Sequence, residues 1–315
     1  MNGIPVIAVV GPTASGKTSL SIKIAKYKNG EIISADSMQI YKNMSIASAA
    51  PTAEEKGSIK PHRFEFLPQN ARFTVAQYVD MARDNINAVY SSGKLPIIVG
   101  GTGLYVDSLL NNISFKTEET EETERVRREL ETQYETLGGE KMLKMLGEFD
   151  PETAKKLHAN DKKRILRAFE VYKIHNKTLT QLNIESKKTP SPYNVLFIGL
   201  RFVDREILYD RINKRVDIML ENGLLEEARK AYDNSMNSPY YSTAFQAIGH
   251  KEFFDYFNGT DSLENCVERL KMSTRRYAKR QMTWFNRNSE IHWIDVDLCD
   301  DPFIVAKNII DECKF

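Results

Sequence analysis

The fold is decided by one short stretch near the start of the chain, Gly11-Pro12-Thr13-Ala14-Ser15-Gly16-Lys17-Thr18. It matches the pattern G-x-x-x-x-G-K-[ST], whose glycines let backbone N–H groups wrap a chain of phosphates. Lys17 supplies a positive charge to the terminal phosphate, and the Thr18 hydroxyl is placed to bind Mg²⁺. The stretch therefore predicts a site for a diphosphate or triphosphate. A plain glycine-rich turn that caps a helix is the disfavoured alternative.

Buried strands surround this motif. The Ile- and Val-rich runs at residues 5–10, 31–34 and 95–99 are typical of strands covered on both faces of a parallel sheet. Helical spacing at residues 19–26 and 74–90 lies between them and gives a βαβ order. Further elements are expected later in the chain, namely strands at residues 195–200 and 291–294 and one amphipathic helix over residues 206–232.

Residues 116–192 have a different character, because strand-like runs are few and helical patterns dominate. Asp150 followed by Pro151 is typical of a helix start within this region. We therefore expect an α/β fold with a P-loop NTPase-like core, in which helices flank a parallel sheet. Residues 1–115 and 193–315 would form this catalytic core, and residues 116–192 would form an all-helical insertion domain.

The composition is that of a globular protein. With 41% hydrophobic and 28% charged residues, the disordered, collagen-like and disulfide-scaffold classes are excluded. Three widely spaced cysteines without a CxxC or Cys/His cluster predict neither disulfides nor a zinc site. The start of the chain lacks the features of a signal peptide, and no apolar run is long enough to span a membrane. We therefore expect a soluble, cytoplasmic protein that does not bind membranes.

The charge is balanced in total but uneven along the chain. Lys and Arg number 44 against 43 Asp and Glu, which gives a net charge of +1 and no general affinity for nucleic acid. Residues 271–287 nevertheless hold six basic side chains, no acidic ones and interleaved aromatic rings, with Arg276 and Arg280 on one helix face. A second basic patch covers residues 155–167, and an acidic stretch covers residues 118–135. Such patches suit RNA phosphates and unstacked bases, although solvated helix faces with aromatics turned inward would look the same.

The type of reaction is indicated by the residues that follow the strands. An ATPase would normally carry an Asp at a strand end, yet the strand at residues 95–99 runs into Gly100-Gly101-Thr102, so transfer is favoured over hydrolysis. Asp36 follows the strand at residues 31–34, and ligands gather at the carboxyl ends of parallel strands. We expect Asp36 to act there as a general base. Capping of the next turn is the alternative role for Asp36, and loop geometry is the alternative role for Thr102.

A series of short motifs is spread along nearly the whole chain. They are Gly11 to Thr18, Ser34 to Ser37, Tyr41, Pro61 to Arg63, Gly100 to Tyr105, Asp150-Pro151, His158, Asn160-Asp161, Arg164-Ile165, Arg167 to Val171, Arg211 to Asn213, Arg215-Val216, Gly249, Lys251-Glu252, Ala278 to Gln281 and Thr283 to Phe285. This series closely resembles the tRNA dimethylallyltransferase family, also called tRNA isopentenyltransferases. It is far more specific than the phosphate loop alone.

The resemblance implies a defined reaction. A dimethylallyl group passes from dimethylallyl diphosphate to N6 of the adenosine 3′-adjacent to the anticodon, in tRNAs that read codons beginning with U. By this resemblance Asp36 is the general base, and Thr18, Lys17 and Arg215 complete the catalytic group. The diphosphate would bind to Gly11, Pro12, Thr13, Ala14, Ser15, Gly16, Lys17 and Thr18, with Mg²⁺ at Thr18. Base flipping is expected because N6 is inaccessible in a stacked loop.

The resemblance also implies a surface for tRNA. The insertion domain would grip the anticodon stem-loop, and Thr102 would contact the target nucleotide. The expected tRNA-binding residues are Asp36, Ser37, Met38, Gln39, Thr102, Arg127, Lys163, Arg164, Ile165, Leu166, Arg167, Arg276 and Arg280. We expect a monomer whose partners are tRNA and dimethylallyl diphosphate.

Three positions depart from the family pattern. Ala50 stands where lysine is usual, His250 where tyrosine is usual, and Asn286 where arginine is usual. None of them belongs to the predicted catalytic group, so the chemistry is expected to survive. Two alternatives stay open, a P-loop kinase acting on a small molecule or nucleoside, which Asp36 would also suit, and an inactive RNA-binding paralogue.

Overall fold

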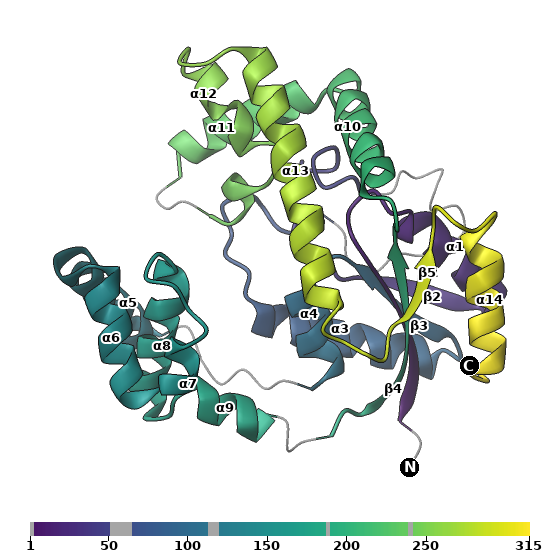
Figure 1. Cartoon of the computed structure of the whole chain (residues 1–315), viewed down its shortest axis with the longest axis horizontal. Coiled ribbons are helices and arrows are strands. Elements are labelled where there is room, and N and C mark those ends of the chain that lie inside the picture. Colours follow the sequence, from purple (N-terminus) through teal and green to yellow (C-terminus); the bar gives the residue numbers. More distant parts are fainter. Residues whose placement is uncertain (1–2, 51–64, 113–119, 187–189, 239–241) are drawn as a thin grey trace. The chain divides into compact units, whose positions relative to one another are not determined.

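The computed structural model describes residues 3–50, 65–112, 120–186, 190–238 and 242–315. They form two compact units, Met1–Leu110 together with Pro192–Phe315, which we call the core unit, and Asn111–Ser191, which we call the helical unit (Figure 1). Pro61 to Arg63 and the expected domain border at residue 116 lie outside the described residues.

A five-stranded parallel sheet forms the centre of the core unit, in the order β2-β3-β1-β4-β5. The strands are β1 (Ile4–Val10), β2 (Gly30–Ser34), β3 (Leu95–Gly100), β4 (Tyr193–Arg201) and β5 (His292–Asp295). In the middle of the sheet Val9 of β1 lies opposite Val99 of β3 and Ile198 of β4. These β-branched runs are buried on both faces, as strands of a parallel sheet usually are. The predicted fold class is confirmed.

Helices connect the strands and cover the sheet. In the core unit they are α1 (Lys17–Tyr27), α3 (Val75–Ser91), α4 (Gly103–Leu110), α10 (Arg205–Glu221), α11 (Leu224–Met236), α12 (Phe254–Phe257), α13 (Leu263–Phe285) and α14 (Pro302–Glu312), with short 3₁₀ turns η1 (Ala244–Gln246) and η2 (Lys251–Phe253). The helices predicted at residues 19–26 and 74–90 are confirmed as α1 and α3. A capping box begins α3, because Thr74 and Gln77 exchange side-chain hydrogen bonds with each other's backbone N–H. No helix in the described part of the chain is long and apolar enough to cross a membrane.

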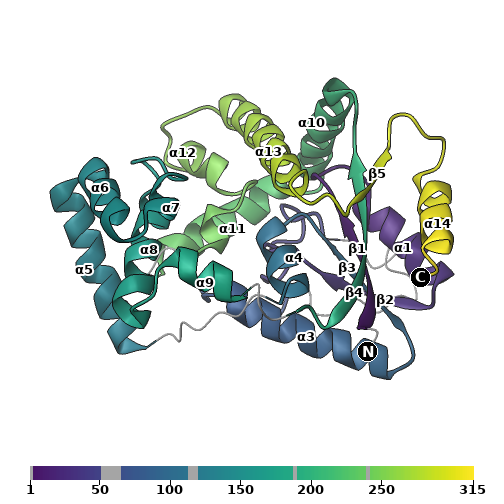
Figure 2. The same ribbon diagram turned by 60° about the horizontal axis from the view of Figure 1, so that its bottom comes forward.

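The two faces of the sheet are covered by different helices. On one face α1 and α14 lie side by side, and Ile24 and Ile310 pack with Ile7 and Val9 of β1 into one apolar cluster (Figures 1 and 2). On the other face α3 packs against β2, β3 and α4. The carboxyl ends of β1, β2 and β3 then meet at one edge, which is where ligands bind in parallel sheets.

The long helix predicted over residues 206–232 is wrong, because two helices occupy this stretch. Helix α10 ends at Glu221, and α11 begins at Leu224. Gly223 separates them with a φ of 93°, a left-handed conformation that breaks the helical ladder and that glycine adopts without a steric penalty. Because the apolar repeat continues through both helices, spacing alone did not reveal the break; the signal was the pair Asn222-Gly223.

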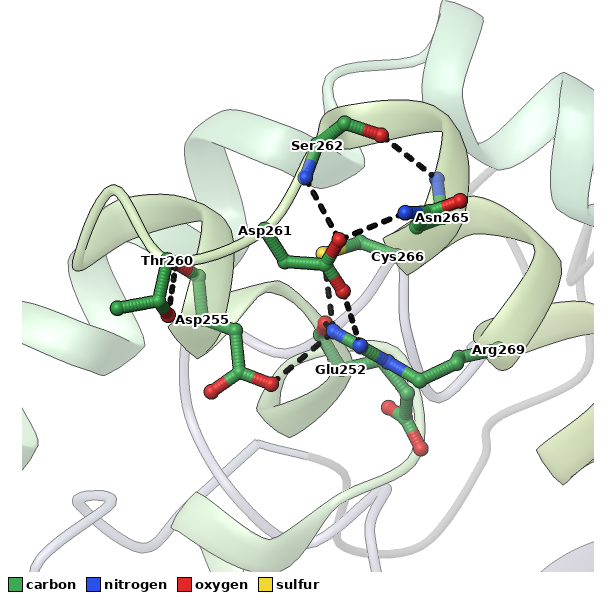
Figure 3. A network of polar contacts seen from close by, with 8 residues as sticks. All are labelled: Glu252, Asp255, Thr260, Asp261, Ser262, Asn265, Cys266 and Arg269. Atoms are coloured by element: carbon green, nitrogen blue, oxygen red, sulfur yellow. Dashed lines mark hydrogen bonds and ion pairs between the residues drawn. The ribbon is translucent and has the colours of Figure 1, made fainter.

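A polar network anchors the first half of α13 (Figure 3). The helix starts where the Ser262 hydroxyl accepts the N–H of Asn265. One turn later, the Arg269 guanidinium forms ion pairs with Asp255, at 3.1 Å, and with Asp261, and donates to the Glu252 carbonyl at 3.2 Å. The network ties α13 to η2 and α12, so the direction of this long helix is set at its start.

The helical unit contains no strand in its described residues. Its helices are α5 (Glu121–Leu137), α6 (Gly139–Phe149), α7 (Pro151–Ala154), α8 (Lys162–His175) and α9 (Leu179–Ser186). Leu130, Met142, Leu146, Ile165 and Phe169 form its apolar core. The predicted helix start at Asp150-Pro151 is confirmed, because Asp150 caps α7 and Pro151 is its first residue.

Asp150→Ala should destabilise the helical unit. The carboxylate is 2% exposed and accepts four hydrogen bonds, from the N–H and hydroxyl groups of Thr153 and Thr180. Leaving these donors without a partner should cost about 2–4 kcal/mol of unfolding free energy. Denaturant unfolding measures the loss of free energy. Hydrogen exchange of the amides in α7 and α9 shows whether the loss is local to these helices.

A matched control is Glu148→Gln, which removes an exposed charge on α6. Burial by itself would raise the pKa of Asp150, but the hydrogen bonds from Thr180 and Thr153 outweigh it and lower the pKa. The stabilisation is therefore present above the ordinary carboxyl pKa and is lost as the pH falls through the lowered one. Equal unfolding midpoints for wild type and Asp150→Ala would contradict this account.

Candidate active site

The phosphate loop joins β1 to α1 and forms one wall of a pocket. Residues 13–18 line this pocket, whose volume is about 940 Å³. Gly11 and Pro12 are buried beneath the loop and are not among its lining residues. The Lys17 ammonium donates a hydrogen bond to the Pro12 carbonyl at 2.6 Å, which folds its side chain back along the loop. Six of the eight residues predicted to bind a diphosphate thus line this pocket, and Gly11 and Pro12 do not.

The lining of the pocket has two chemical characters. Cations reach it from the loop and from α10, namely Lys17, Arg211, Lys214 and Arg215. Aliphatic side chains form the rest of the wall, among them Ile22, Ile32, Ile46, Ile218 and Met219. A ligand that carries both a phosphate group and a short hydrocarbon would satisfy both parts of this lining.

Asp36 lies directly after β2 and lines the same pocket. The N–H of Met38 donates to Asp36 Oδ1 at 2.9 Å, so the carboxylate also closes the turn that follows the strand. Burial raises the pKa of Asp36, and the Met38 hydrogen bond and the Lys17 charge oppose the rise without cancelling it. Both roles considered for Asp36, turn capping and a place in the site, are therefore compatible in the structure. A carboxylate with a raised pKa is a better proton acceptor.

Arg215 lies close enough to Lys17 for its charge to change the pKa of the Lys17 ammonium. Burial and the Arg215 charge lower the pKa of Lys17 to about 7, and the Asp36 charge opposes them. Two positive groups held close together attract a phosphate strongly, because the attraction of the anion to both groups offsets their mutual repulsion. The three residues Lys17, Asp36 and Arg215 thus belong to one electrostatic group, although they come from three elements.

The loop after β2 is held from behind by Thr102. The N–H of Ser37 donates to the Thr102 hydroxyl at 3.2 Å, and the N–H of Thr102 donates to the Ala35 carbonyl at 3.2 Å. Gln39 lines the pocket, whereas Ser37, Met38 and Thr102 are not among its lining residues. Loop geometry is therefore the role that the contacts of Thr102 support.

Gln281 of α13 connects two loops of the site, a role that was not assigned to it although it ends the motif Ala278 to Gln281. Its Oε1 accepts the N–H of Thr13 at 2.8 Å, and its Nε2 donates to the Gly101 carbonyl at 3.0 Å. A Cβ atom on Gly101 would lie 2.0 Å from Gln281 Nε2, and one on Gly103 would lie 2.3 Å from Trp284 Cδ1. Because these two residues have no side chain, α13 can pack closely against the loop that follows β3. Arg211, Lys214 and Tyr277 are further pocket residues to which the sequence assigned no role.

The basic stretch at residues 271–287 is divided between two uses. Lys271 pairs with Asp217 at 2.9 Å, and Arg275 donates to Asn213 at 2.6 Å, so both hold α13 against α10. Arg276, Lys279 and Arg280 are exposed on the helix surface. The aromatic residues face inward, because Trp284 donates to Asp107 at 2.8 Å and Phe285 is buried.

The helical unit holds the other predicted tRNA-binding residues. Arg127 and Arg167 both contact Oε1 of the buried Glu170, at 3.0 and 2.7 Å. Ile165 is fully buried in the apolar core and Leu166 packs against that core, so these two side chains stabilise α8 and do not form a binding surface. Lys163 and Arg164 are exposed.

The pocket lining includes oxygen atoms of the kind that bind a metal ion. Thr18 contributes a hydroxyl from the first turn of α1, and Asp36 contributes a carboxylate. The described residues contain no group of three or more His, Cys, Asp or Glu side chains able to hold a metal ion. Mg²⁺ usually binds through one or two protein oxygens together with phosphates and water. The residues present therefore fit a magnesium ion that binds together with a diphosphate.

Comparison with known proteins leads to a single family. A family model described as IPP transferase matches residues 39–288. The tRNA dimethylallyltransferase of Acetivibrio thermocellus is 46% identical over 308 residues, and the match covers 96% of each chain. A solved structure of a tRNA delta(2)-isopentenylpyrophosphate transferase from Staphylococcus epidermidis is 40% identical, with a TM-score of 0.69 and coverage of 98% of this chain and 99% of that one. A eukaryotic dimethylallyltransferase acting on tRNA gives a TM-score of 0.82 at 28% identity, over 99% of this chain and 79% of that one.

Binding of inorganic diphosphate should be coupled to the uptake of a proton. Because the pKa of Lys17 is lowered to about 7, a large share of the unliganded protein carries a neutral Lys17 at neutral pH, and bound phosphate favours the charged form. Above this pKa the affinity should fall by up to about tenfold per pH unit. Calorimetric titration in buffers of different ionisation enthalpy measures the protons taken up.

Lys17→Arg is the matched control, because arginine stays charged throughout this range. It should remove the part of the proton uptake that belongs to the protein and leave only the part due to diphosphate itself. Identical proton uptake in wild type and Lys17→Arg would show that Lys17 does not titrate on binding.

Proposed function

The chain belongs to the IPP transferase family, and we propose that it transfers a dimethylallyl group from dimethylallyl diphosphate to tRNA. The acceptor is N6 of the adenosine directly 3′ of the anticodon, in tRNAs that read codons beginning with U, and diphosphate is released. Its relatives are tRNA dimethylallyltransferases, and the protein is a transferase.

One observation carries the proposal, namely a pocket whose lining combines phosphate-binding cations, an aliphatic wall and Asp36. The phosphate loop with Lys17 and Arg215 suits the diphosphate of the donor. The aliphatic residues suit its short hydrocarbon, which needs an environment that excludes water. Asp36 is available for the proton of the acceptor amine.

The proposed step forms one bond and breaks one. The N6 lone pair attacks C1 of the donor, the C1–O bond breaks, and its electron pair leaves with the diphosphate. The Asp36 carboxylate takes the N6 proton. Lys17, Arg215 and the N–H groups of the phosphate loop stabilise charge on the leaving group, where one well-placed donor is commonly worth about 10² to 10³ in rate. Bound Mg²⁺, held by Thr18, would add to this neutralisation.

The tRNA would be bound by exposed and half-buried cations of both units. In the core unit, Arg276 and Arg280 stand one turn apart on α13. In the helical unit we assign Arg127, Lys163, Arg164 and Arg167 to the anticodon stem-loop, with residues 116–192 acting as a tRNA-binding domain. The similarity to a eukaryotic dimethylallyltransferase acting on tRNA supports this assignment. Flipping of the target base would bring N6 to Asp36.

Different observations argue against the two alternatives. A small-molecule or nucleoside kinase finds no support among the relatives, which are tRNA dimethylallyltransferases. An inactive paralogue would have no need for Lys17, Asp36 and Arg215 in one pocket, yet all three are present there. We propose an active, monomeric enzyme that works in the cytoplasm with Mg²⁺.

Asp36→Asn should lower kcat by about 10² to 10⁴ because it removes the base. Unmodified tRNA that reads codons beginning with U is incubated with dimethylallyl diphosphate, and the nucleosides are analysed by mass spectrometry. The control is Asp80→Asn, a carboxylate on α3 whose side chain is 77% exposed. ATP consumption without RNA modification would overturn the proposed function.

Arg280→Ala should weaken tRNA binding and reduce the slope of log Kd against log salt by about 1. Arg280 is exposed, and its guanidinium lies 5.7 Å from the centre of the Tyr277 ring, which orients it. Filter binding at several salt concentrations gives the slope. Lys307→Ala on α14 removes an exposed charge elsewhere on the core unit and should leave the slope unchanged. An unaltered slope in Arg280→Ala would mean that Arg280 does not contact a phosphate.

A further inference from the structure

Part of the pocket wall is a short turn formed by residues 45–50. Five of its six residues line the pocket, all except Ala47. The turn is closed by hydrogen bonds from the N–H of Ala50 to the Ser45 carbonyl at 2.9 Å and from the N–H of Ala49 to the Ile46 carbonyl at 3.0 Å. These two hydrogen bonds lie within the turn, so they do not determine how far the turn stands from the phosphate loop. Contacts from elsewhere must therefore set the width of the pocket here.

On its outer side the turn is held by Glu227, in the first turn of α11. Glu227 Oε2 accepts the N–H of Ile46 at 2.9 Å, and Oε1 accepts the N–H of Ala47 at 2.9 Å. The residue is 8% exposed, so both bonds are shielded from water. Gln39 makes a weaker contact from the other side, donating to the Ser48 carbonyl at 3.3 Å.

The Glu227 carboxylate is itself held by His250. His250 is completely buried, and its Nε2 lies 2.9 Å from Glu227 Oε1. Because an ionised carboxylate only accepts hydrogen bonds, Nε2 carries the proton of this pair. Gly249, the preceding residue, packs so closely on the turn that a Cβ atom there would lie 3.0 Å from Ala47 Cβ.

The arrangement needs a carboxylate and not an amide. Three donors converge on Glu227, from Ile46, Ala47 and His250, and an ionised carboxylate can accept all three. The amide of a glutamine has one acceptor oxygen, so its NH₂ group would face a donor that it cannot satisfy. Burying an ionised carboxylate is costly unless hydrogen bonds satisfy its oxygens. The three donors must therefore stay in place around Glu227.

We propose that Glu227 is a positioning residue for the hydrocarbon of the donor, with His250 as its support. By holding the N–H groups of Ile46 and Ala47, it keeps residues 45–50 at the distance at which a dimethylallyl group fits beside the diphosphate. The inference rests on the proposed function. The phosphate loop is held separately, by Gln281 on Thr13, so its grip on the diphosphate does not depend on Glu227.

The test compares wild type with Glu227→Gln and with Glu226→Gln as the matched control. Glu226 lies in the same first turn of α11 and carries the same charge, but it is exposed. Steady-state transfer is measured with dimethylallyl diphosphate at saturating tRNA, and binding of inorganic diphosphate is measured by calorimetry. Hydrogen exchange of a peptide spanning residues 44–50 reports on the turn directly.

Glu227→Gln should raise KM for dimethylallyl diphosphate about tenfold and leave kcat within about twofold. Its affinity for inorganic diphosphate should be unchanged, and the N–H groups of Ile46 and Ala47 should exchange faster. Its preference for dimethylallyl over the longer geranyl diphosphate should decrease. His250→Phe, which keeps a ring but removes the donor, should shift KM in the same direction by a smaller factor.

Two results would overturn the proposal. One is a KM and a geranyl preference in Glu227→Gln equal to those of wild type. The other is a joint loss of kcat, diphosphate affinity and thermal stability, which would indicate a general folding defect. A wild-type protein that binds diphosphate but transfers no prenyl group would overturn the proposed function instead. The exchange and diphosphate measurements report on Glu227 without any catalysis, so the two failures are distinguishable.

Discussion

The side chain of Gln281 is the contact on which the active site depends. It accepts from Thr13 in the phosphate loop and donates to Gly101 after β3, so one buried amide joins both loops to α13. The next residue, Thr102, accepts the N–H of Ser37 and thereby holds the turn that carries Asp36. Hydrogen bonds and short backbone links therefore connect the phosphate loop to the predicted base. The pairing of β1 with β3 and of β3 with β2 adds to the positioning of the loop relative to Asp36.

The electrostatics of the site follow from bringing like and unlike charges into a small, shielded space. Burial and Arg215 lower the pKa of Lys17, while burial raises the pKa of Asp36. Each group thus departs from its ordinary ionisation in the direction that favours the neutral form. A bound diphosphate would reverse this for Lys17, because its negative charge favours the ammonium.

Much of the core unit could be predicted because its signals are local. Continuous Ile and Val runs identify strands covered on both faces, and the phosphate-loop motif identifies the turn between β1 and α1. Local signals failed where one pattern served two elements. The apolar repeat of residues 206–232 continues through α10 and α11, and only the positive φ of Gly223 divides them. Similarly, the basic run of residues 155–167 did not reveal that Ile165 is buried in the core of the helical unit.

By itself, the sequence determined the parallel-sheet fold, the phosphate loop and the resemblance to tRNA isopentenyltransferases, because these depend on residue type and spacing along the chain. Only the tertiary structure decided which distant side chains meet. Gln281 reaches Thr13 across 268 positions, and Glu227 reaches Ile46 across 181. The physical reason is that each of these hydrogen bonds depends on where a helix docks against a distant loop, and packing over the whole core unit determines that position. No short pattern in the sequence records it.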